Sequence, residues 1–271
     1  MPGRFVTHTH LTSQTIAPRR VDVWLPPGYD ADTGGRYPVL YAHDGQNLFD
    51  PATAYIGVDW GLHTALETLL HQGQARPAIL VGIWNTSRRV AEYLPRRPLQ
   101  PAWRARLRVW MRLRTRIDSD NYLRFIVSEL KPYMDGAYRT LPGPQDTFVL
   151  GSSMGGLISL YAVCEYPQVF GGVACVSTHW PILGDLSLPY LRETLPPAGR
   201  HKLYFDYGTG KGDELYAPYQ AQVDALLREK GYAEGVNWQT LRFDGAEHSE
   251  RAWRQRAHLP LAFLLGPQQG G

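Results

Sequence analysis

The apolar and polar positions of this chain repeat with two periods, one typical of strands and one typical of helices. Residues 7–11 and 20–25 alternate between apolar and polar side chains, which predicts two strands of an antiparallel hairpin. Six later segments predict further strands, and the first two are continuous apolar runs, as expected of strands buried on both faces. These six segments are residues 37–42, 77–83, 147–150, 172–177, 202–206 and 238–243.

Between these strands lie segments with helical patterns of apolar residues. They are residues 58–70, 121–134, 153–165, 216–230 and 249–265. Alternation of strand and helix after an opening hairpin predicts an α/β fold with a mostly parallel central sheet, an antiparallel N-terminal hairpin and helices on both faces. We expect one domain over residues 1–271. Within it, an irregular insertion rich in proline and arginine, residues 86–117, is predicted to fold over the carboxyl ends of the strands as a cap.

Composition fits such a domain and narrows the class of protein. With 271 residues and 44% hydrophobic content, the chain can bury a large core. It has no apolar run of about 18 residues that would predict a membrane span, and its first residues lack the apolar segment of a signal peptide. Cys164 and Cys175 fall in a helix pattern and a strand pattern, so we expect free buried thiols, which favours a cytoplasmic location.

The formal net charge of +3 hides a local excess of arginine. Residues 86–120 hold ten arginines against three acidic residues, so this segment carries +7 and the rest of the chain −4. The chain shows no recognisable nucleic-acid-binding fold, and its surface outside the segment is net acidic, so we expect no nucleic-acid partner. Solvated helix faces, or a cap that attracts an anionic acyl substrate, explain the arginines better.

One motif carries the strongest chemical signal. The strand predicted at 147–150 runs into Gly151-Ser152-Ser153-Met154-Gly155, and a helical pattern follows. G-x-S-x-G between a strand and a helix is the signature of a nucleophile elbow, a tight turn that lifts the serine hydroxyl above the edge of the sheet. The flanking glycines are needed because the turn leaves no room for side chains. Ser153 is therefore the predicted nucleophile, and an idle serine in a glycine-rich turn is the alternative.

A serine hydroxyl needs a base to take its proton. In elbow enzymes the chain order is serine, then acid, then histidine. Of the histidines after Ser153, His248 follows the last predicted strand in a loop that can reach the elbow, and it is the predicted base. The other candidates are His179, His201 and His258, the last two of which fit core or surface positions.

The histidine in turn needs an acid to hold its tautomer. Asp213 is the preferred acid, because it follows the strand at 202–206 through a flexible glycine-containing loop. Asp206 at the strand end and Glu214 beside Asp213 are competitors. Without a catalytic role, Asp206 would form a hydrogen bond at the end of the strand and Glu214 would be a solvated charge.

The tetrahedral intermediate of acyl transfer needs two backbone N–H donors. One is the amide of Met154, directly after the nucleophile. The other is expected in the loop that follows the strand at 37–42, where Gly45 permits a sharp turn and the Gln46 N–H is our choice. A simple Asp-Gly turn is the alternative. Asp44, in the same loop, is a candidate substrate-binding residue.

Taken together, these motifs resemble one family. The likeness rests on Tyr-Ala-His-Asp-Gly-Gln-Asn-Leu-Phe-Asp-Pro-Ala-Thr-Ala at 41–54, Gly-Ser-Ser-Met-Gly-Gly at 151–156 and Gly-Ala-Glu-His-Ser-Glu-Arg-Ala-Trp at 245–253. They are similar to the esterase group of α/β-hydrolases that includes enterochelin esterases, feruloyl and acetyl-xylan esterases of the first carbohydrate esterase family, and mycolyltransferases. The likeness covers most of the chain and specifies the superfamily far better than the substrate.

The resemblance implies an α/β-hydrolase fold and a role for each matching residue. Ser153 and His248 match the family's nucleophile and base, Asp213 matches its acid, and Gln46 and Met154 match its oxyanion positions.

The resemblance also implies that the segment 85–95 borders the pocket through Asn85, Arg89, Glu92 and Tyr93. The arginine-rich stretch that follows, with Trp103 and Trp110, departs from the family pattern as we match it. Three more candidates for the pocket wall follow strand or loop ends near the expected site, although core packing would explain them equally well. They are Trp60, His179 and Trp180.

The sequence thus predicts a serine carboxylic-ester hydrolase that works through an acyl-enzyme and takes a small-molecule ester. An acyltransferase of the same fold and a non-catalytic ligand-binding protein are the alternatives. His8 and His10 are too few for a metal site, and we expect neither a metal nor another cofactor. The sequence does not identify the acyl group or the alcohol of the ester. It also leaves the oligomeric state open, and a homo-oligomer is one of the options.

Overall fold

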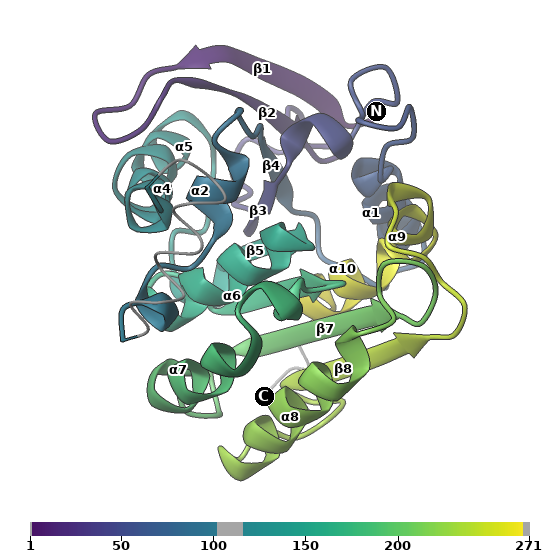
Figure 1. The fold of residues 1–271 in the computed structure, drawn as a ribbon. Helices are drawn as coiled ribbons and strands as arrows, with labels where there is room; N and C mark the ends of the chain where they lie inside the picture. Colours follow the sequence, from purple (N-terminus) through teal and green to yellow (C-terminus); the bar gives the residue numbers. More distant parts are fainter. Residues whose placement is uncertain (1, 102–115, 268–271) are drawn as a thin grey trace.

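The computed structural model describes residues 2–101 and 116–267, and its centre is one eight-stranded sheet (Figure 1). The strand order is β1-β2-β4-β3-β5-β6-β7-β8. β1 pairs antiparallel with β2, β2 pairs antiparallel with β4, and the pairs from β4 to β8 are parallel. The strands are β1 (Arg4–Leu11), β2 (Arg19–Leu25), β3 (Val39–His43), β4 (Ile79–Ile83), β5 (Thr147–Ser152), β6 (Gly172–Val176), β7 (Lys202–Gly208) and β8 (Trp238–Phe243).

Helices cover both faces of this sheet, and the alternation of side chains along each strand decides which helices a residue meets. In β3, Val39 and Tyr41 join a core with the helices on one face, whereas Leu40 and Ala42 join a second core on the other. The first face carries α2 (Arg89–Tyr93), α4 (Ser119–Phe125), α5 (Lys131–Ala137), α6 (Met154–Glu165), α7 (Ser187–Thr194) and α8 (Tyr216–Glu229); the second carries α1 (Leu62–His71), α9 (Glu250–Arg256) and α10 (His258–Leu265) (Figure 1). The predicted fold class is confirmed.

Two predicted helices are subdivided, and in each case a proline explains the change. The helix expected at 121–134 runs from α4 through a π-helical turn, η3 (Ile126–Leu130), into α5, where Pro132 has no N–H to donate. The helix expected at 249–265 breaks at Ala257, because Pro260 cannot donate to the carbonyl of Arg256. Two short helices, α2 and α7, were not predicted.

The order of the strands places the functional loops. β3 and β5 lie side by side at the centre of the sheet, and the chain leaves them toward opposite edges: β3 is followed by β4, and β5 by β6. Ligands of open α/β sheets bind at such a switch point, beyond the carboxyl ends of the strands. The loop after β3 and the turn after β5 both lie there.

Three sequence predictions concern the rest of the chain. Of the expected cap at 86–117, the structure describes α2 and η2 (Arg97–Leu99), whereas 102–115, with Trp103 and Trp110, lie outside the described residues, so the cap stays a prediction. Cys164 and Cys175 are both buried and free; the cytoplasmic location stays a prediction. Over the described ranges, no helix has the length and apolar character to cross a membrane.

Candidate active site

Ser153 occupies a sharp turn between β5 and α6. Its backbone has φ 56° and ψ −120°, a conformation that costs a non-glycine residue energy and that persists only when neighbouring groups hold it. Here the Ser153 N–H donates to the carbonyl of Val176 at 2.9 Å, and the Ser153 carbonyl accepts the N–H of His179 at 3.2 Å. Gly151 is required, since a Cβ there would lie 2.6 Å from the carbonyl carbon of Gly155.

His248 lies in the loop between β8 and α9, with its imidazole held on three sides. Its Nδ1 is 2.5 Å from Oδ1 of Asp213. The ring packs edge-to-face against Tyr216, at 5.7 Å between ring centroids, and against Trp253, at 4.9 Å. Close packing continues on the backbone side, where a Cβ on Gly212, which has φ +95°, would lie 2.6 Å from the Cβ of His248.

Asp213 is buried and accepts hydrogen bonds on both carboxylate oxygens. While Oδ1 faces His248, Oδ2 accepts the hydroxyl of Ser177 at 2.6 Å and the N–H of Gly208 at 2.7 Å. Burial alone would raise the pKa of Asp213, but the hydrogen bonds from His248, Ser177 and Gly208 outweigh it and lower the pKa below its usual value. The carboxylate therefore stays ionised beside the imidazole at neutral pH.

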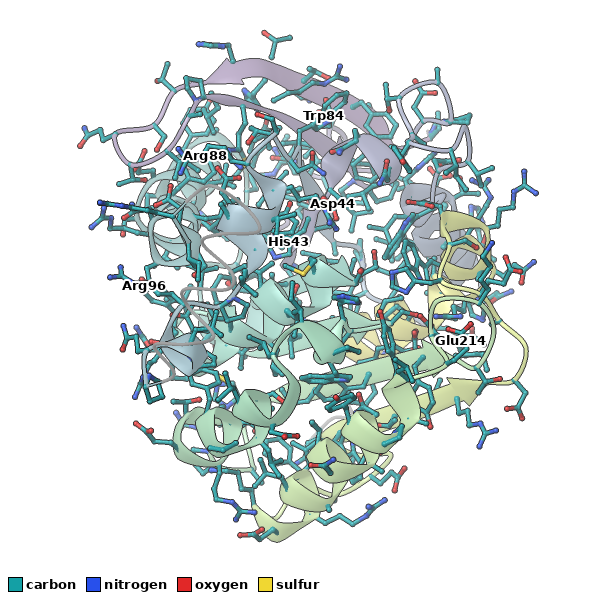
Figure 2. All side chains as sticks on the ribbon, in the orientation of Figure 1. His43, Asp44, Trp84, Arg88, Arg96 and Glu214 are labelled. Atoms are coloured by element: carbon teal, nitrogen blue, oxygen red, sulfur yellow. The ribbon has the colours of Figure 1, made fainter. Side chains whose placement is uncertain are left out.

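The competing acids are engaged elsewhere. Asp206 forms a buried ion pair with Arg256 at 2.9 Å and accepts the hydroxyl of Tyr204, and burial raises its pKa. Glu214 is exposed and accepts the N–H of Gly212 (Figure 2). The geometry thus brings Asp213, rather than either neighbour, to His248.

The other candidate histidines have different partners. Nδ1 of His179 is 2.7 Å from the hydroxyl of Tyr216, and Nε2 of His201 is 3.0 Å from the carbonyl of Pro167. His258 is exposed at the start of α10.

The loop after β3 forms a tight turn opposite the elbow. Asp44 has φ 59° and ψ 47°, and a short 3-10 turn, η1 (Gly45–Asn47), follows it. Glycine is needed at position 45, because a Cβ there would lie 2.6 Å from the backbone of Gly82. The Gln46 N–H belongs to the first turn of η1 and the Met154 N–H to the first turn of α6, where backbone donors lack acceptors within their own helix.

Asp44 is the centre of a charged cluster in this loop. Its Oδ1 accepts from Arg89 Nε at 2.8 Å and from Asn85 Nδ2 at 2.6 Å, and its Oδ2 accepts from Arg89 Nη2 at 2.7 Å. Burial would raise the pKa of Asp44, but the Arg89 guanidinium outweighs it, so the pKa is lowered. Asp44 and its neighbour His43 are both buried, and Figure 2 shows them near the centre of the view.

Most of these groups line one cavity of about 540 Å³, within the range of small-molecule sites, whereas Asp213 and Met154 are not among the described residues that line it. Its wall includes six residues predicted from the sequence: Ser153, His248, Gln46, Asp44, Asn85 and Arg89. It also includes Tyr55 and Ile56, two exposed apolar side chains that sequence reasoning missed, since their loop has no periodic pattern.

Five predicted binding residues are not among the described residues that line the cavity. Trp60 packs on Trp253 at 5.5 Å between ring centroids, and Trp180 is buried with its Nε1 donating to Gln220. Glu92 is buried in an ion pair with Arg19.

The remaining two, Tyr93 and His179, do not line the cavity but contact residues around it. The hydroxyl of Tyr93 accepts the backbone N–H of Asp44 at 3.3 Å. His179 holds the carbonyl of Ser153 and contacts Tyr216, as given above. The side chain of Tyr93 therefore acts on Asp44 and that of His179 on Tyr216, whereas His179 contacts Ser153 through its backbone.

Sequence reasoning also missed Ser177, the residue directly after β6. Its hydroxyl donates to Asp213 and accepts from Trp253 Nε1 at 3.1 Å and from Arg256 Nη2 at 2.9 Å. The signal that could have found it is its position, since β6 adjoins β5 and the carboxyl ends of parallel strands meet at one edge of the sheet.

Comparisons with known proteins agree with this architecture. The protein called YbbA of Bacillus subtilis (strain 168) is 26% identical over 267 residues, which are 94% of this chain and 96% of that protein. Solved structures with similar folds include a ferulic acid esterase, with 19% identity and a TM-score of 0.69 over 98% of this chain and 99% of the other.

Two further structures cover most of this chain but less of their own. An IroE-like serine hydrolase from Shewanella oneidensis has 19% identity and a TM-score of 0.72 over 96% of this chain and 79% of the other. The enterobactin esterase FES from Shigella flexneri has 19% identity and a TM-score of 0.69, and the match covers 97% of this chain but 59% of that one. At these identities the likeness shows the shared fold. A family model described as "Putative esterase" matches residues 13–258, so this chain belongs to that esterase family.

Proposed function

We propose that this protein hydrolyses carboxylic esters through a covalent acyl-enzyme, with Ser153 as nucleophile, His248 as base and Asp213 as acid. The single observation that carries the proposal is the pairing of His248 Nδ1 with Asp213 Oδ1 at 2.5 Å, in a histidine that shares one cavity wall with a serine on a strained turn. Because Nδ1 faces Asp213, Nε2 is the nitrogen available to Ser153.

In the first half-reaction, Nε2 of His248 removes the proton of Ser153 as Oγ bonds to the ester carbonyl carbon. The carbonyl π electrons move to oxygen, and the N–H groups of Gln46 and Met154 are the proposed donors to this oxyanion. The ionised Asp213 stabilises the imidazolium that forms. When the intermediate collapses, the bond to the alcohol oxygen breaks, and His248 gives its proton to the departing alcohol.

The second half-reaction repeats these steps with water. His248 takes a proton from water, the resulting hydroxide adds to the acyl carbon, and a second tetrahedral intermediate forms. Its collapse breaks the bond to Ser153 Oγ, which regains a proton from His248, and the carboxylic acid leaves. Each cycle therefore consumes one ester and one water and returns the enzyme unchanged.

Covalent labelling tests the nucleophile directly. A fluorophosphonate should modify the folded protein at Ser153, and Ser153→Ala should abolish both labelling and hydrolysis of p-nitrophenyl acetate. Ser159→Ala is the matched control, because Ser159 lies on the same helix, α6, with its hydroxyl bonded to the backbone carbonyl of Gly155. Loss of the nucleophile should lower kcat by several orders of magnitude, roughly 10⁴-fold or more. Folded protein that neither labels nor hydrolyses esters would refute the proposal.

A substrate panel would then narrow the ester. The named neighbours of this fold suggest feruloyl esters and siderophore trilactones, to which acetylated sugars and a p-nitrophenyl chain-length series should be added. Including an alcohol acceptor separates hydrolysis from acyl transfer, because a transferase would form a new ester at the expense of the free acid. Tyr55 and Ile56 expose apolar side chains at the cavity wall, where they could cover an apolar part of the substrate. We therefore expect apolar groups on the ester to raise kcat/KM.

A further inference from the structure

The cavity that holds the proposed nucleophile also contains a carboxylate. Asp44 lines it together with Ser153 and Gln46. Asp44 Oδ2 also faces the first turn of α6, since a methyl group placed on Gly155 would lie 3.6 Å from that oxygen. The N-terminal end of a helix carries a partial positive charge that would favour an oxyanion. An uncompensated carboxylate at this place would oppose the same oxyanion.

Arg89 compensates this carboxylate within the described structure. Its guanidinium forms a two-pronged ion pair with Asp44, at 2.8 Å from Nε to Oδ1 and 2.7 Å from Nη2 to Oδ2. The carboxylate is shielded from water, with 8% of the Asp44 side chain exposed, whereas 29% of the Arg89 side chain is exposed. Arg89 also packs over the ring of Tyr93, at 5.1 Å from its guanidinium carbon to the ring centroid. Arginine suits this position because its planar fork matches a carboxylate.

The same ion pair fixes the turn that carries Gln46. Asp44 has left-handed backbone angles, which a non-glycine residue adopts at a cost, and its N–H donates to the hydroxyl of Tyr93 at 3.3 Å. With its carboxylate bound by Arg89 and Asn85 and its backbone bound by Tyr93, Asp44 is held at both ends. Gln46 follows two residues later, so the direction of its N–H depends on this anchor.

We propose that Arg89 is a positioning residue that makes the oxyanion site electrostatically competent: it neutralises Asp44 beside the developing negative charge and, through Asp44, holds the Gln46 turn. This inference rests on the proposed esterase function. It gives Arg89 a different role from the direct substrate contact expected from the sequence, because its Nε and Nη2 donate to a residue of the protein itself.

A double-substitution cycle tests this inference, with kcat and KM measured on p-nitrophenyl acetate. A unit charge about 6–12 Å away, at an effective dielectric of about 20, corresponds to roughly 10- to 100-fold in rate. Arg89→Gln should therefore lower kcat by about that factor and change KM by less than about threefold. Asp44→Asn removes the offending charge, so Asp44→Asn with Arg89→Gln should recover at least about fivefold of the kcat lost in Arg89→Gln alone.

Two further measurements separate this role from a merely structural one. Affinity for a boronic acid, whose serine adduct is a tetrahedral anion, should weaken in Arg89→Gln as much as kcat falls. Arg89→Lys keeps the charge but loses the planar fork, so its kcat should fall less than that of Arg89→Gln, and by no more than about tenfold even if Arg89→Gln does not fold. Arg88→Gln is the matched control, since Arg88 is half-exposed and pairs with Asp118, away from Asp44 (Figure 2); it should leave kcat unchanged.

The outcomes are distinguishable. If the wild type hydrolyses esters and labels at Ser153, but Asp44→Asn does not restore the double variant, or Arg89→Lys loses as much kcat as Arg89→Gln, the inference is overturned while the esterase proposal stands. If the wild type neither labels nor hydrolyses any ester, both fall together. Recovery in the double variant, with matching loss of boronic acid affinity in Arg89→Gln, supports the role of Arg89.

Discussion

Ser177 should be the residue whose small side chain matters most to the stability of the proposed site. A serine hydroxyl can donate one hydrogen bond and accept two, and Ser177 makes all three. It donates to Asp213 Oδ2 at 2.6 Å and accepts from Arg256 Nη2 at 2.9 Å and Trp253 Nε1 at 3.1 Å. Its own backbone has φ 42°, which alanine tolerates about as well as serine, so Ser177→Ala isolates the hydroxyl.

The expected cost follows from these three bonds. A hydrogen bond to a charged group contributes about 1.5–3 kcal/mol, and a buried donor left without a partner costs about 1–3 kcal/mol. Ser177→Ala removes one of the donors to Asp213 and leaves the buried Trp253 N–H unpaired, while Arg256 Nη2 keeps its bond to Asp206. The free energy of unfolding should therefore fall by about 3–5 kcal/mol, and Tm by on the order of 10 °C.

Catalysis should suffer less than stability. Asp213 would keep its bonds to Gly208 and His248, but one of its oxygens would lose an anchor, so kcat should fall by about tenfold through looser placement of the imidazole. Thermal unfolding and p-nitrophenyl acetate hydrolysis measure the two effects. Ser187→Ala is the matched control, because its hydroxyl makes one bond to the backbone carbonyl of Gly184, and it should cost about 1 kcal/mol. A Ser177→Ala protein as stable as the Ser187→Ala protein would refute the reasoning.

Three further changes have definite expected results. Gly212 has φ +95°, and Gly212→Ala would place a methyl group 2.6 Å from the Cβ of His248. Because the imidazole would have to shift, kcat should fall by about 100-fold, and full retention of kcat would contradict the packing described. Burial lowers the pKa of His43 from 6.5 to about 3, so between these pH values the unfolded chain binds a proton at this residue that the folded chain does not. The free energy of unfolding should therefore drop by about 1.4 kcal/mol for each pH unit of acidification in this range. In urea titrations at pH 4 to 6, His43→Gln should remove this contribution to the pH dependence. Glu92→Gln breaks the buried pair with Arg19 and should cost about 3–5 kcal/mol in urea unfolding, whereas a loss below about 1 kcal/mol would mean that the pair is not isolated from water.

Much of the fold could be predicted from local patterns. The eight strands and the five main helical segments follow from periods of two and about 3.6 residues, and the structure differs mainly where a proline interrupts hydrogen bonding, as at Pro132 and Pro260. The helix α7 escaped prediction because it is short and its apolar positions are few. Its place is decided by packing, with Tyr190 and Leu191 buried against the first core.

The catalytic candidates were predictable for a related reason. Ser153, Asp213 and His248 each follow a strand, and parallel strands bring their carboxyl ends to one edge of the sheet, so local signals imply a shared location. The glycine pattern around Ser153 adds a second local signal, because only glycine fits the close approach of Gly151 to Gly155. The choice among Asp206, Asp213 and Glu214 was open, since adjacent loop residues carry the same chemistry.

By itself, the sequence determined which segments form strands and helices, that the sheet is mostly parallel, and that a serine, an acid and a histidine lie at its carboxyl edge; these follow from periodicity, glycine placement and chain order. The tertiary structure alone decided the partners. It directs Asp213 to His248 and Asp206 to Arg256, turns Arg89 onto Asp44, and buries Trp180. Such pairings depend on distances of a few ångströms between residues far apart in the chain, and a local pattern of side chains does not encode those distances.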